Sequence, residues 1–148
     1  MNLSRNFTLD EFEVSETAAR RGIDNAAPPS LIGPITYVAQ GLERVRHLCG
    51  GYPVIITSGY RCPDLNAVVG GSRTSQHMRG EAADFIIPTF GPALMICRLL
   101  VAERVVFDQL IHEYGRWVHV SFVPKQSRRE VLTIDAHGTR QGLHEARA

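Results

Sequence analysis

The sequence predicts an α+β fold in which helices come first and a mainly antiparallel sheet follows, with the helices packed on one side. Apolar residues recur at helical spacing between residues 31 and 45, whereas residues 105–123 alternate in the manner of strands around Gly115-Arg116. The 148 residues are 44% hydrophobic and 21% charged, which is ordinary for a globular protein. We therefore expect a single domain over residues 1–148.

A capping box predicts where the first helix begins. Thr8 is placed as the N-cap and Glu11 stands three residues later, so each can bond the other's backbone amide. Phe7 and Phe12 flank the box and are placed to pack across it. We expect this helix to end before Gly22.

A second helix follows the proline-containing linker of residues 26–30 and ends at Gly50-Gly51. Its apolar residues lie at helical spacing: Leu31, Ile35, Val38, Leu42 and Val45. Residues 53–57 then form a short buried strand. A helical turn over 64–69 precedes the polar, glycine-bounded stretch 72–80, which we expect to be a loop.

The second half supplies the remaining strands. Residues 82–87 are predicted as a strand and residues 92–103 as a helix. Residues 105–113 and 117–123 then form a hairpin, and residues 129–135 add an edge strand. The remaining polar tail, residues 136–148, is expected to be frayed.

Charge and cysteine content exclude several classes of function. A formal net charge of +1 without a basic, aromatic-rich stripe gives no reason to expect nucleic-acid binding. Cys49, Cys62 and Cys97 are odd in number and widely spaced, so they predict neither a disulfide framework nor a thiolate zinc site. The chain starts without an apolar signal region and contains no apolar run of membrane-spanning length.

Three side chains suggest a metal centre. His77 lies in the predicted loop, Asp84 in the following strand, and His119 in a later strand. Imidazole and carboxylate both suit zinc, and catalytic zinc sites use three protein ligands and keep one position open. Alternation places His119 on the face opposite Val118 and Val120, where a cleft can lie.

The hairpin register decides where Glu113 points. A two-residue turn at Gly115-Arg116 would pair Glu113 with Val118 and bury a carboxylate among valines, which is costly. A three-residue connection shifts the register by one and places Glu113, Ile111 and Gln109 on the face of His119. We favour this second register, although a glycine in the turn fits either.

These segments closely resemble the zinc D-alanyl-D-alanine carboxypeptidase family, and the chain looks most like its compact phage and prophage members. The resemblance covers about residues 5–123. The matching residues are Thr57-Ser58-Gly59-Tyr60-Arg61, Asn66, Gly70-Gly71, the string Ser75-x-His77-x-x-Gly80-x-Ala82-x-Asp84, and Trp117-Val118-His119-Val120-Ser121. This resemblance implies a hedgehog/DD-peptidase-like fold and a peptidase-like domain.

The resemblance also implies roles for individual residues. It makes His77, Asp84 and His119 the ligands of a Zn²⁺ ion, and Glu113 matches the acidic residue of hedgehog-type members. The remaining implied residues bind substrate or support the first ligand: Arg61, Ser75, Gln76 and Trp117. Many carboxypeptidase-type members carry a second histidine at the position of Trp117, so Arg116, His112 or Arg61 would have to replace it.

The expected activity is metal-assisted hydrolysis of a peptide bond in peptidoglycan. Glu113 would take a proton from the attacking water and pass it to the leaving amine. Two other interpretations remain open: a non-catalytic zinc-binding module for recognition or virion structure, and an endolysin-type endopeptidase that cuts the L-alanyl-D-glutamate link. The orientation of Glu113 separates the first from hydrolysis, and the length of the cleft separates the second from a carboxypeptidase.

The expected partner is the peptidoglycan peptide itself, with no nucleic acid and no membrane span. We expect a monomer that is synthesised in the cytoplasm without a signal peptide. It would reach the cell wall by lysis, through a holin or on a virion.

Overall fold

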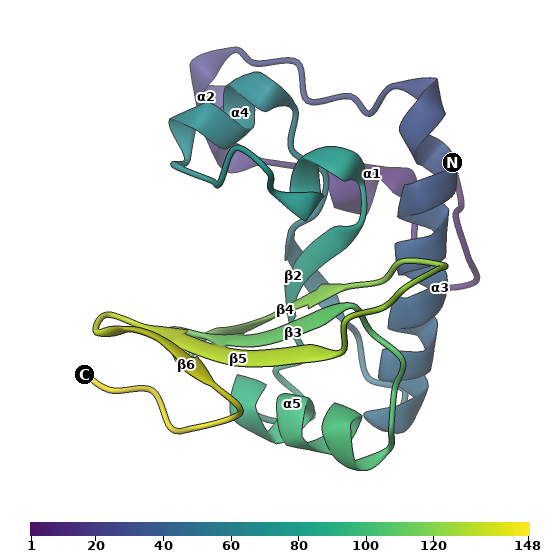
Figure 1. Cartoon of the computed structure of the whole chain (residues 1–148). Helices are drawn as coiled ribbons and strands as arrows, with labels where there is room; N and C mark the ends of the chain where they lie inside the picture. Colours follow the sequence, from purple (N-terminus) through teal and green to yellow (C-terminus); the bar gives the residue numbers. More distant parts are fainter.

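A six-stranded sheet with the order β1-β2-β4-β3-β5-β6 organises the fold in the computed structural model, which describes residues 1–148 (Figure 1). All neighbouring strands pair antiparallel except β3 and β5, which run parallel. The strands are β1 (Ile55–Ser58), β2 (Ala82–Ile86), β3 (Gln109–Glu113), β4 (Trp117–Ser121), β5 (Glu130–Asp135) and β6 (Gly138–Gln141). The predicted α+β class with a mainly antiparallel sheet is confirmed.

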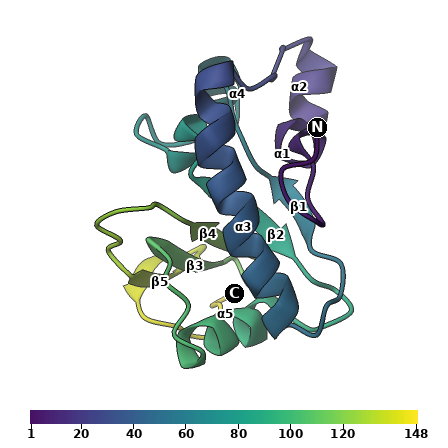
Figure 2. The ribbon, with the colours of Figure 1, turned by 90° about the vertical axis from the view of Figure 1, so that its right-hand side faces the viewer.

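Two longer helices cover one face of the sheet, and the short helices gather at one end of β1 and β2 (Figures 1 and 2). The helical elements are α1 (Leu9–Glu13), α2 (Glu16–Arg21), η1 (Pro29–Leu31), α3 (Ile32–Leu48), α4 (Pro63–Val68), η2 (Gln76–Arg79) and α5 (Ala93–Ala102). Of these, α3 and α5 pack on the core face, while α2, α4 and η2 border the opposite side. None of the helices combines the length and the apolar character that crossing a bilayer requires.

The start of the chain forms two helices where one was predicted. The capping box is present, since the Thr8 amide donates to the Glu11 carboxylate over 2.7 Å. The rings of Phe7 and Phe12 are both buried and meet edge to face. However, Ser15 accepts a hydrogen bond from the Ala18 amide and caps a second helix. A competing N-cap therefore interrupts the predicted helix.

The core lies between the sheet and the long helices. The predicted apolar face of α3 is buried at Ile35, Val38, Leu42 and Val45, whereas Leu31 lies in η1 and is only partly buried. From the sheet, Phe85, Leu110, Val118 and Val120 point to the same core. Because successive strand residues alternate between faces, the neighbours of these residues stand on the opposite face.

The hairpin between β3 and β4 has the predicted three-residue connection. Glu113 pairs with Trp117, and Ile111 pairs with His119. The connection needs positive φ angles at Tyr114 (54°) and Gly115 (67°). Glycine adopts this conformation at no steric cost, whereas Tyr114 is strained in it. The favoured register is thus confirmed, and Glu113 shares a face with His119.

Strand β3 begins at Gln109, four residues later than predicted. The Val105 amide still bonds the Leu100 carbonyl at the end of α5, so this part of the chain completes the helix terminus. Val105 and Phe107 are buried and Val106 is exposed, so this link between helix and sheet has the alternating pattern that is typical of a strand.

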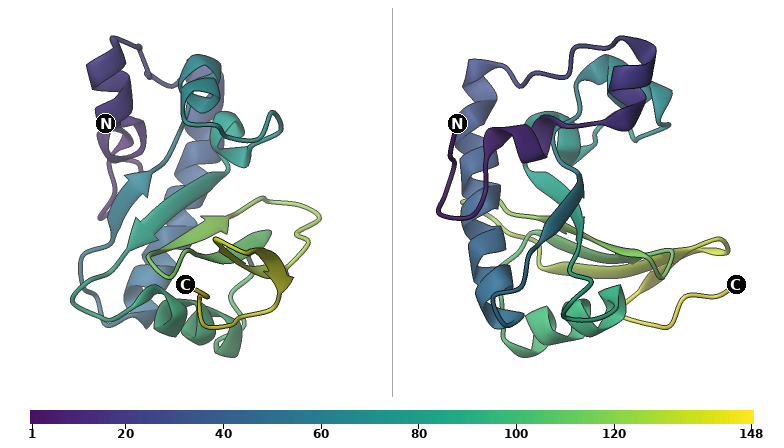
Figure 3. Two further views of the ribbon diagram at one scale, coloured as in Figure 1. Left: turned by 90° about the vertical axis from the view of Figure 1, so that its left-hand side faces the viewer. Right: turned by 180° about the vertical axis from the view of Figure 1, so that it is seen from behind.

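Two expectations for the C-terminal segment are wrong. Strand β5 is not an edge strand, because β6 pairs with it on its outer side. The segment 136–148 is not frayed: besides forming β6, it supplies Arg140 and Arg147, which bond the buried Asp135 carboxylate over 3.0 and 3.1 Å. Figure 3 shows this last segment leaving the end of β6 near α5 and running back towards the turn between β5 and β6, where His137 Nε2 bonds the Ala148 oxygen. The charged residues that suggested a frayed tail instead form ion pairs with Asp135.

The three cysteines are free. Cys49 and Cys97 are fully buried in the core, and burial raises the pKa of Cys49 to about 11 and that of Cys97 to about 12. Cys62 is only partly buried and lies just before α4.

Candidate metal centre

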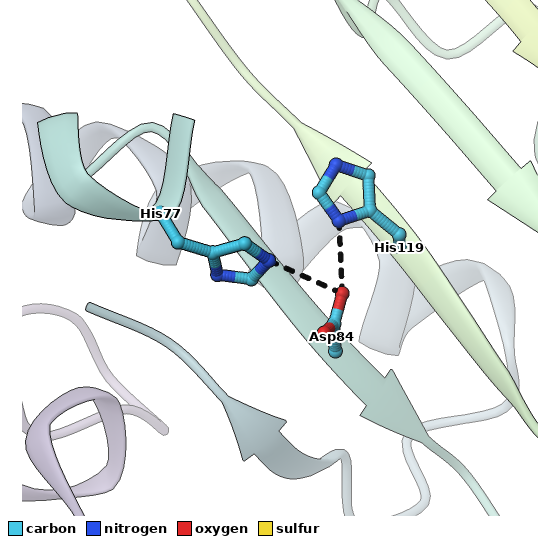
Figure 4. A group of neighbouring side chains, drawn as sticks. All are labelled: His77, Asp84 and His119. Carbon is cyan, nitrogen blue, oxygen red and sulfur yellow. Dashed lines mark hydrogen bonds and ion pairs between the residues drawn. The ribbon is translucent and has the colours of Figure 1, made fainter. Parts of the chain in front are cut away.

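Three segments that are distant in sequence bring His77, Asp84 and His119 together (Figure 4). His77 comes from η2, while Asp84 on β2 and His119 on β4 are direct cross-strand partners. One carboxylate oxygen, Asp84 Oδ1, lies 3.4 Å from His77 Nε2 and 2.8 Å from His119 Nδ1. The possible ligand atoms of the three residues all lie within 4.8 Å of one another.

The backbone fixes the orientation of the His77 ring. His77 Nδ1 lies 2.7 Å from the carbonyl oxygen of Gly59, so this nitrogen carries the proton and donates it. Nε2 is then the nitrogen with the free lone pair, and it faces Asp84. A histidine whose other ring nitrogen donates to a carbonyl is the usual arrangement of a metal ligand.

Only glycine fits at position 59, because the backbone of Phe12 leaves no room for a side chain. A Cβ atom at this position would lie 2.6 Å from both the Cα and the carbonyl oxygen of Phe12. The neighbouring Tyr60 amide also bonds the Phe12 carbonyl over 2.7 Å. The close approach of α1 to the end of β1 therefore sets the position of the carbonyl that orients His77.

The charge state of the three residues favours cation binding. Burial alone would raise the pKa of Asp84, but the two neighbouring imidazoles outweigh burial and hold that pKa well below its usual range. An ionised carboxylate and two imidazole nitrogens form a donor set that suits zinc and similar divalent transition metals. No fourth histidine, cysteine or acidic residue joins the cluster.

Glu113 stands beside these residues without belonging to the ligand cluster. Its Oε1 lies 4.0 Å from His119 Nδ1. Burial, followed by the negative charge of Asp84, raises the pKa of Glu113 to about 7, and the positive charges of His119 and Arg61 offset this only in part. A carboxyl group of this pKa can accept and release a proton near neutral pH.

One cleft of about 800 Å³ is lined by all the expected metal ligands, by Glu113 and by all the expected substrate-binding residues. In addition to the residues above, Arg61, Ser75, Gln76 and Trp117 line it. The Ser75 hydroxyl accepts hydrogen bonds from Arg61 Nη2 (3.3 Å) and from the His77 amide (3.2 Å). Arg61 Nε is a buried donor without a protein partner, an arrangement that is rare unless a ligand completes it.

The family model for peptidase M15 matches residues 5–121 of the chain. The chain belongs to the peptidase M15 family. A 63-residue stretch is also 42% identical to a zinc D-Ala-D-Ala carboxypeptidase of Streptomyces albus G. That stretch covers 43% of this chain and 23% of the carboxypeptidase, so the similarity spans about a quarter of the relative's length.

Many carboxypeptidase-type members carry a second histidine where this chain has Trp117. Of the three residues considered as its replacement, only Arg61 lines the cleft. His112 is buried on the core face, and its Nδ1 lies 3.0 Å from the His144 carbonyl oxygen. Arg116 is exposed in the hairpin turn and does not border the cleft. Arg61 does, next to Asp84 and Glu113.

Two further residues of this M15 site were not predicted to belong to it. Asp108, interpreted from the sequence as fixing the start of a strand, accepts a hydrogen bond from Gln76 Nε2 over 2.9 Å. Arg128 bonds the same Asp108 carboxylate over 2.7 Å and Gln76 Oε1 over 3.3 Å. The hydrogen bonds from Arg128 hold the pKa of Asp108 well below its usual range. Both residues line the cleft and fix Gln76 beside His77.

No local sequence pattern identifies Asp108 and Arg128 as residues of the site. Arg128 comes from the connection between β4 and β5, which passes Asp108 only because β5 is placed parallel to β3. A pattern of single strands does not predict that placement.

The conformation of the loop at residues 70–72, which lines another part of the cleft, follows from local contacts with α4. The side-chain amide of Asn66 donates a hydrogen bond from Nδ2 to the Ser72 carbonyl over 2.9 Å. A Cβ atom at Gly71 would overlap Asn66 Oδ1. The Asn66 and Gly70-Gly71 pattern thus allows the cleft wall to close tightly on α4.

Proposed function

We propose that this chain is a zinc-dependent peptidase that hydrolyses a peptide bond in peptidoglycan. The main support is the convergence of His77, Asp84 and His119 within an open cleft that also contains Glu113. Membership of the M15 family and the relative named a zinc D-Ala-D-Ala carboxypeptidase support the same metal and substrate.

His77 Nε2, Asp84 Oδ1 and His119 Nδ1 would hold the ion. A zinc ion bound there supplies a Lewis acid that polarises a carbonyl and acidifies water. The Gly59 carbonyl keeps the His77 ring in the tautomer that leaves Nε2 unprotonated. Asp84 contributes the negative charge of the site, and its burial limits competition from water.

Glu113 acts as the general acid and base. Its carboxylate lines the cleft beside the ligand residues, where it takes a proton from the attacking water and later returns it to the leaving amine. Arg61 orients the substrate through its guanidinium group, whose Nε has no protein partner. Trp117, Ser75 and Gln76 complete the substrate-binding wall.

A non-catalytic zinc-binding or virion structural module is the alternative. The position of Glu113 favours hydrolysis, because a purely structural site gains nothing from a buried carboxyl 4.0 Å from a ligand histidine. Such a carboxyl instead costs stability when it ionises.

The biological setting belongs to the same proposal. We infer one peptidase-like domain that acts as a monomer in an endolysin-type role, as the resemblance to phage and prophage members implies. Release by lysis, through a holin or on a virion would bring it to the cell wall.

Metal content and turnover together test the proposal. We expect the purified protein to bind one zinc ion, and His77→Ala or Asp84→Ala to weaken zinc binding about 100-fold or more. Glu113→Gln should keep the ion and lower the release of peptides from peptidoglycan by about 10²- to 10⁴-fold. The exposed His47 provides the control, since His47→Ala should change neither property. Full turnover by Glu113→Gln would exclude the proposed mechanism.

A further inference from the structure

We propose that the substrate chain continues on both sides of the cleaved bond, so that this peptidase is an endopeptidase with a second binding arm along the edge strand β1. This inference rests on the proposed function and specifies its substrate.

A second cavity lies on the other side of Arg61 from the main cleft. It has a volume of about 660 Å³, comparable with the 800 Å³ of the first. The two cavities share Arg61, Val69 and Asp84 in their linings, so they meet at the metal centre. Cavities of several hundred Å³ accommodate ligands much larger than one small residue. Removal of a single terminal residue needs no second arm of this size.

The second arm, defined here as this cavity, lies between β1 and the junction of α1 with α2. Ile56, Thr57 and Ser58 form one wall, and residues 14–17 form the other. Strand β1 is at the edge of the sheet and pairs only with β2. The backbone groups of β1 make no hydrogen bond to any other segment. An extended peptide can therefore add to this edge as a further strand.

The edge strand leads directly to the metal centre. Ser58 is the cross-strand partner of Asp84, and the register shifts between Ile56 and Ser58. Such a bulge bends a strand and increases its twist. A peptide that follows the edge of β1 thus reaches the position between Asp84 and Arg61, where the two cavities join.

The chemistry of the two arms differs. The main cleft carries charges of both signs, with Arg61, Arg79 and Arg128 beside the carboxyl groups of Asp84, Asp108 and Glu113. Apart from Arg61 and Asp84, which it shares with the main cleft, the second arm is dominated by hydroxyl groups and apolar side chains. The side chain of its remaining charged residue, Glu16, is 95% exposed to solvent. The second arm thus suits the main chain of an uncharged peptide segment, whereas the main cleft suits a segment that bears charged groups.

Two synthetic wall peptides test the inference with the zinc-loaded protein. The short peptide ends in a free D-Ala-D-Ala, and the long peptide contains the same sequence extended on both sides, with an acetylated and an amidated end. We expect internal cleavage of the long peptide with a kcat/KM about tenfold above that of the short one. Release of one terminal residue from the short peptide without cleavage of the long one would overturn the inference and leave the proposed function standing. Cleavage of neither would overturn both.

A variant that fills the second arm provides the structural test. Thr17 is partly buried in the arm, so Thr17→Trp should lower the ratio of long-peptide to short-peptide kcat/KM about tenfold. Thr89 is exposed in a turn outside both cavities, and Thr89→Trp is the matched control with an unchanged ratio. An unchanged ratio for Thr17→Trp, in a protein with normal thermal unfolding, would contradict the arm.

The hydrogen bonds to β1 can be tested without changing the protein. N-methylation of the long peptide removes one amide donor at a time. Because strand pairing uses alternate residues, we expect cleavage to fall at every second methylated position on one side of the bond. Equal tolerance of all positions would exclude strand addition.

Discussion

At the scale of single residues, Glu113 is the position where folding and function conflict. Its location follows from one physical preference: the alternative register would have placed this carboxylate among core valines. The observed register avoids the core but still buries the group beside Asp84, which raises its pKa to about 7. The sequence predicted on which face of the sheet Glu113 lies. How deeply Glu113 is buried could not be predicted, because the walls of the cleft come from other segments.

This conflict predicts a pH-dependent gain in stability when the carboxyl is removed. Folding raises the pKa of Glu113 from 4.5 to about 7, so the stability it contributes in protonated form is fully present below pH 4.5 and is lost as the pH rises through 7. In metal-free protein, Glu113→Gln should therefore increase the free energy of unfolding at pH 8 by at most about 3 kcal/mol. Most of this gain should be lost at pH 5.

Urea unfolding of both proteins in the presence of a chelator measures the difference. The wild type at each pH is the reference, so acid effects on other groups cancel. A gain of equal size at pH 5 and pH 8 would mean that folding does not shift the pKa of Glu113.

At the scale of elements, the site depends on how α1 meets β1. The elements that carry the ligands were predicted because their patterns are local: β2 and β4 read as strands, and η2 lies within the predicted loop. The break between α1 and α2 was missed, since a second cap at Ser15 competes with an otherwise helical pattern. That break allows the carbonyl groups at the end of α1 to turn towards Tyr60.

Gly59→Ala tests this contact. The added Cβ atom would collide with the backbone of Phe12, so the end of β1 and the carbonyl that orients His77 must shift. We expect a loss of about 1–3 kcal/mol in unfolding free energy and zinc binding about tenfold weaker. Competition with a fluorescent chelator measures the affinity.

Gly33 offers a matched control for this substitution. It lies in α3, where a Cβ atom would meet no other atom within 4 Å, and its φ is negative. Gly33→Ala should leave zinc binding unchanged and stabilise the helix by about 0.5–1 kcal/mol. Equal zinc affinity in both variants would show that Gly59 does not position His77.

At the scale of the whole molecule, the C-terminal segment completes the sheet that holds the site. The sequence identified β5 but not its parallel pairing with β3, because long-range pairing leaves no local pattern. The same pairing carries Arg128 to Asp108 and Gln76. Asp135 is buried, and its bonds from Arg147 and Arg140 hold its pKa well below the usual range.

Removal of residues 136–148 should therefore destabilise the whole domain. Strand β5 would lose its partner β6, and Asp135 would lose both of its arginines. We expect a clearly lower Tm by calorimetry for the shortened chain and an intermediate Tm for Arg140→Ala/Arg147→Ala, which keeps β6. A shortened chain that unfolds at the same temperature as the full chain would show that the segment contributes nothing.

The burial of two thiols has a consequence for where this protein can work. With pKa values of about 11 and 12, Cys49 and Cys97 stay protonated at neutral pH and cannot serve as nucleophiles towards disulfides or oxidants. Among the three thiols, oxidation is thereby confined to Cys62, at the start of α4. The core itself therefore needs no reducing surroundings to keep these two thiols intact.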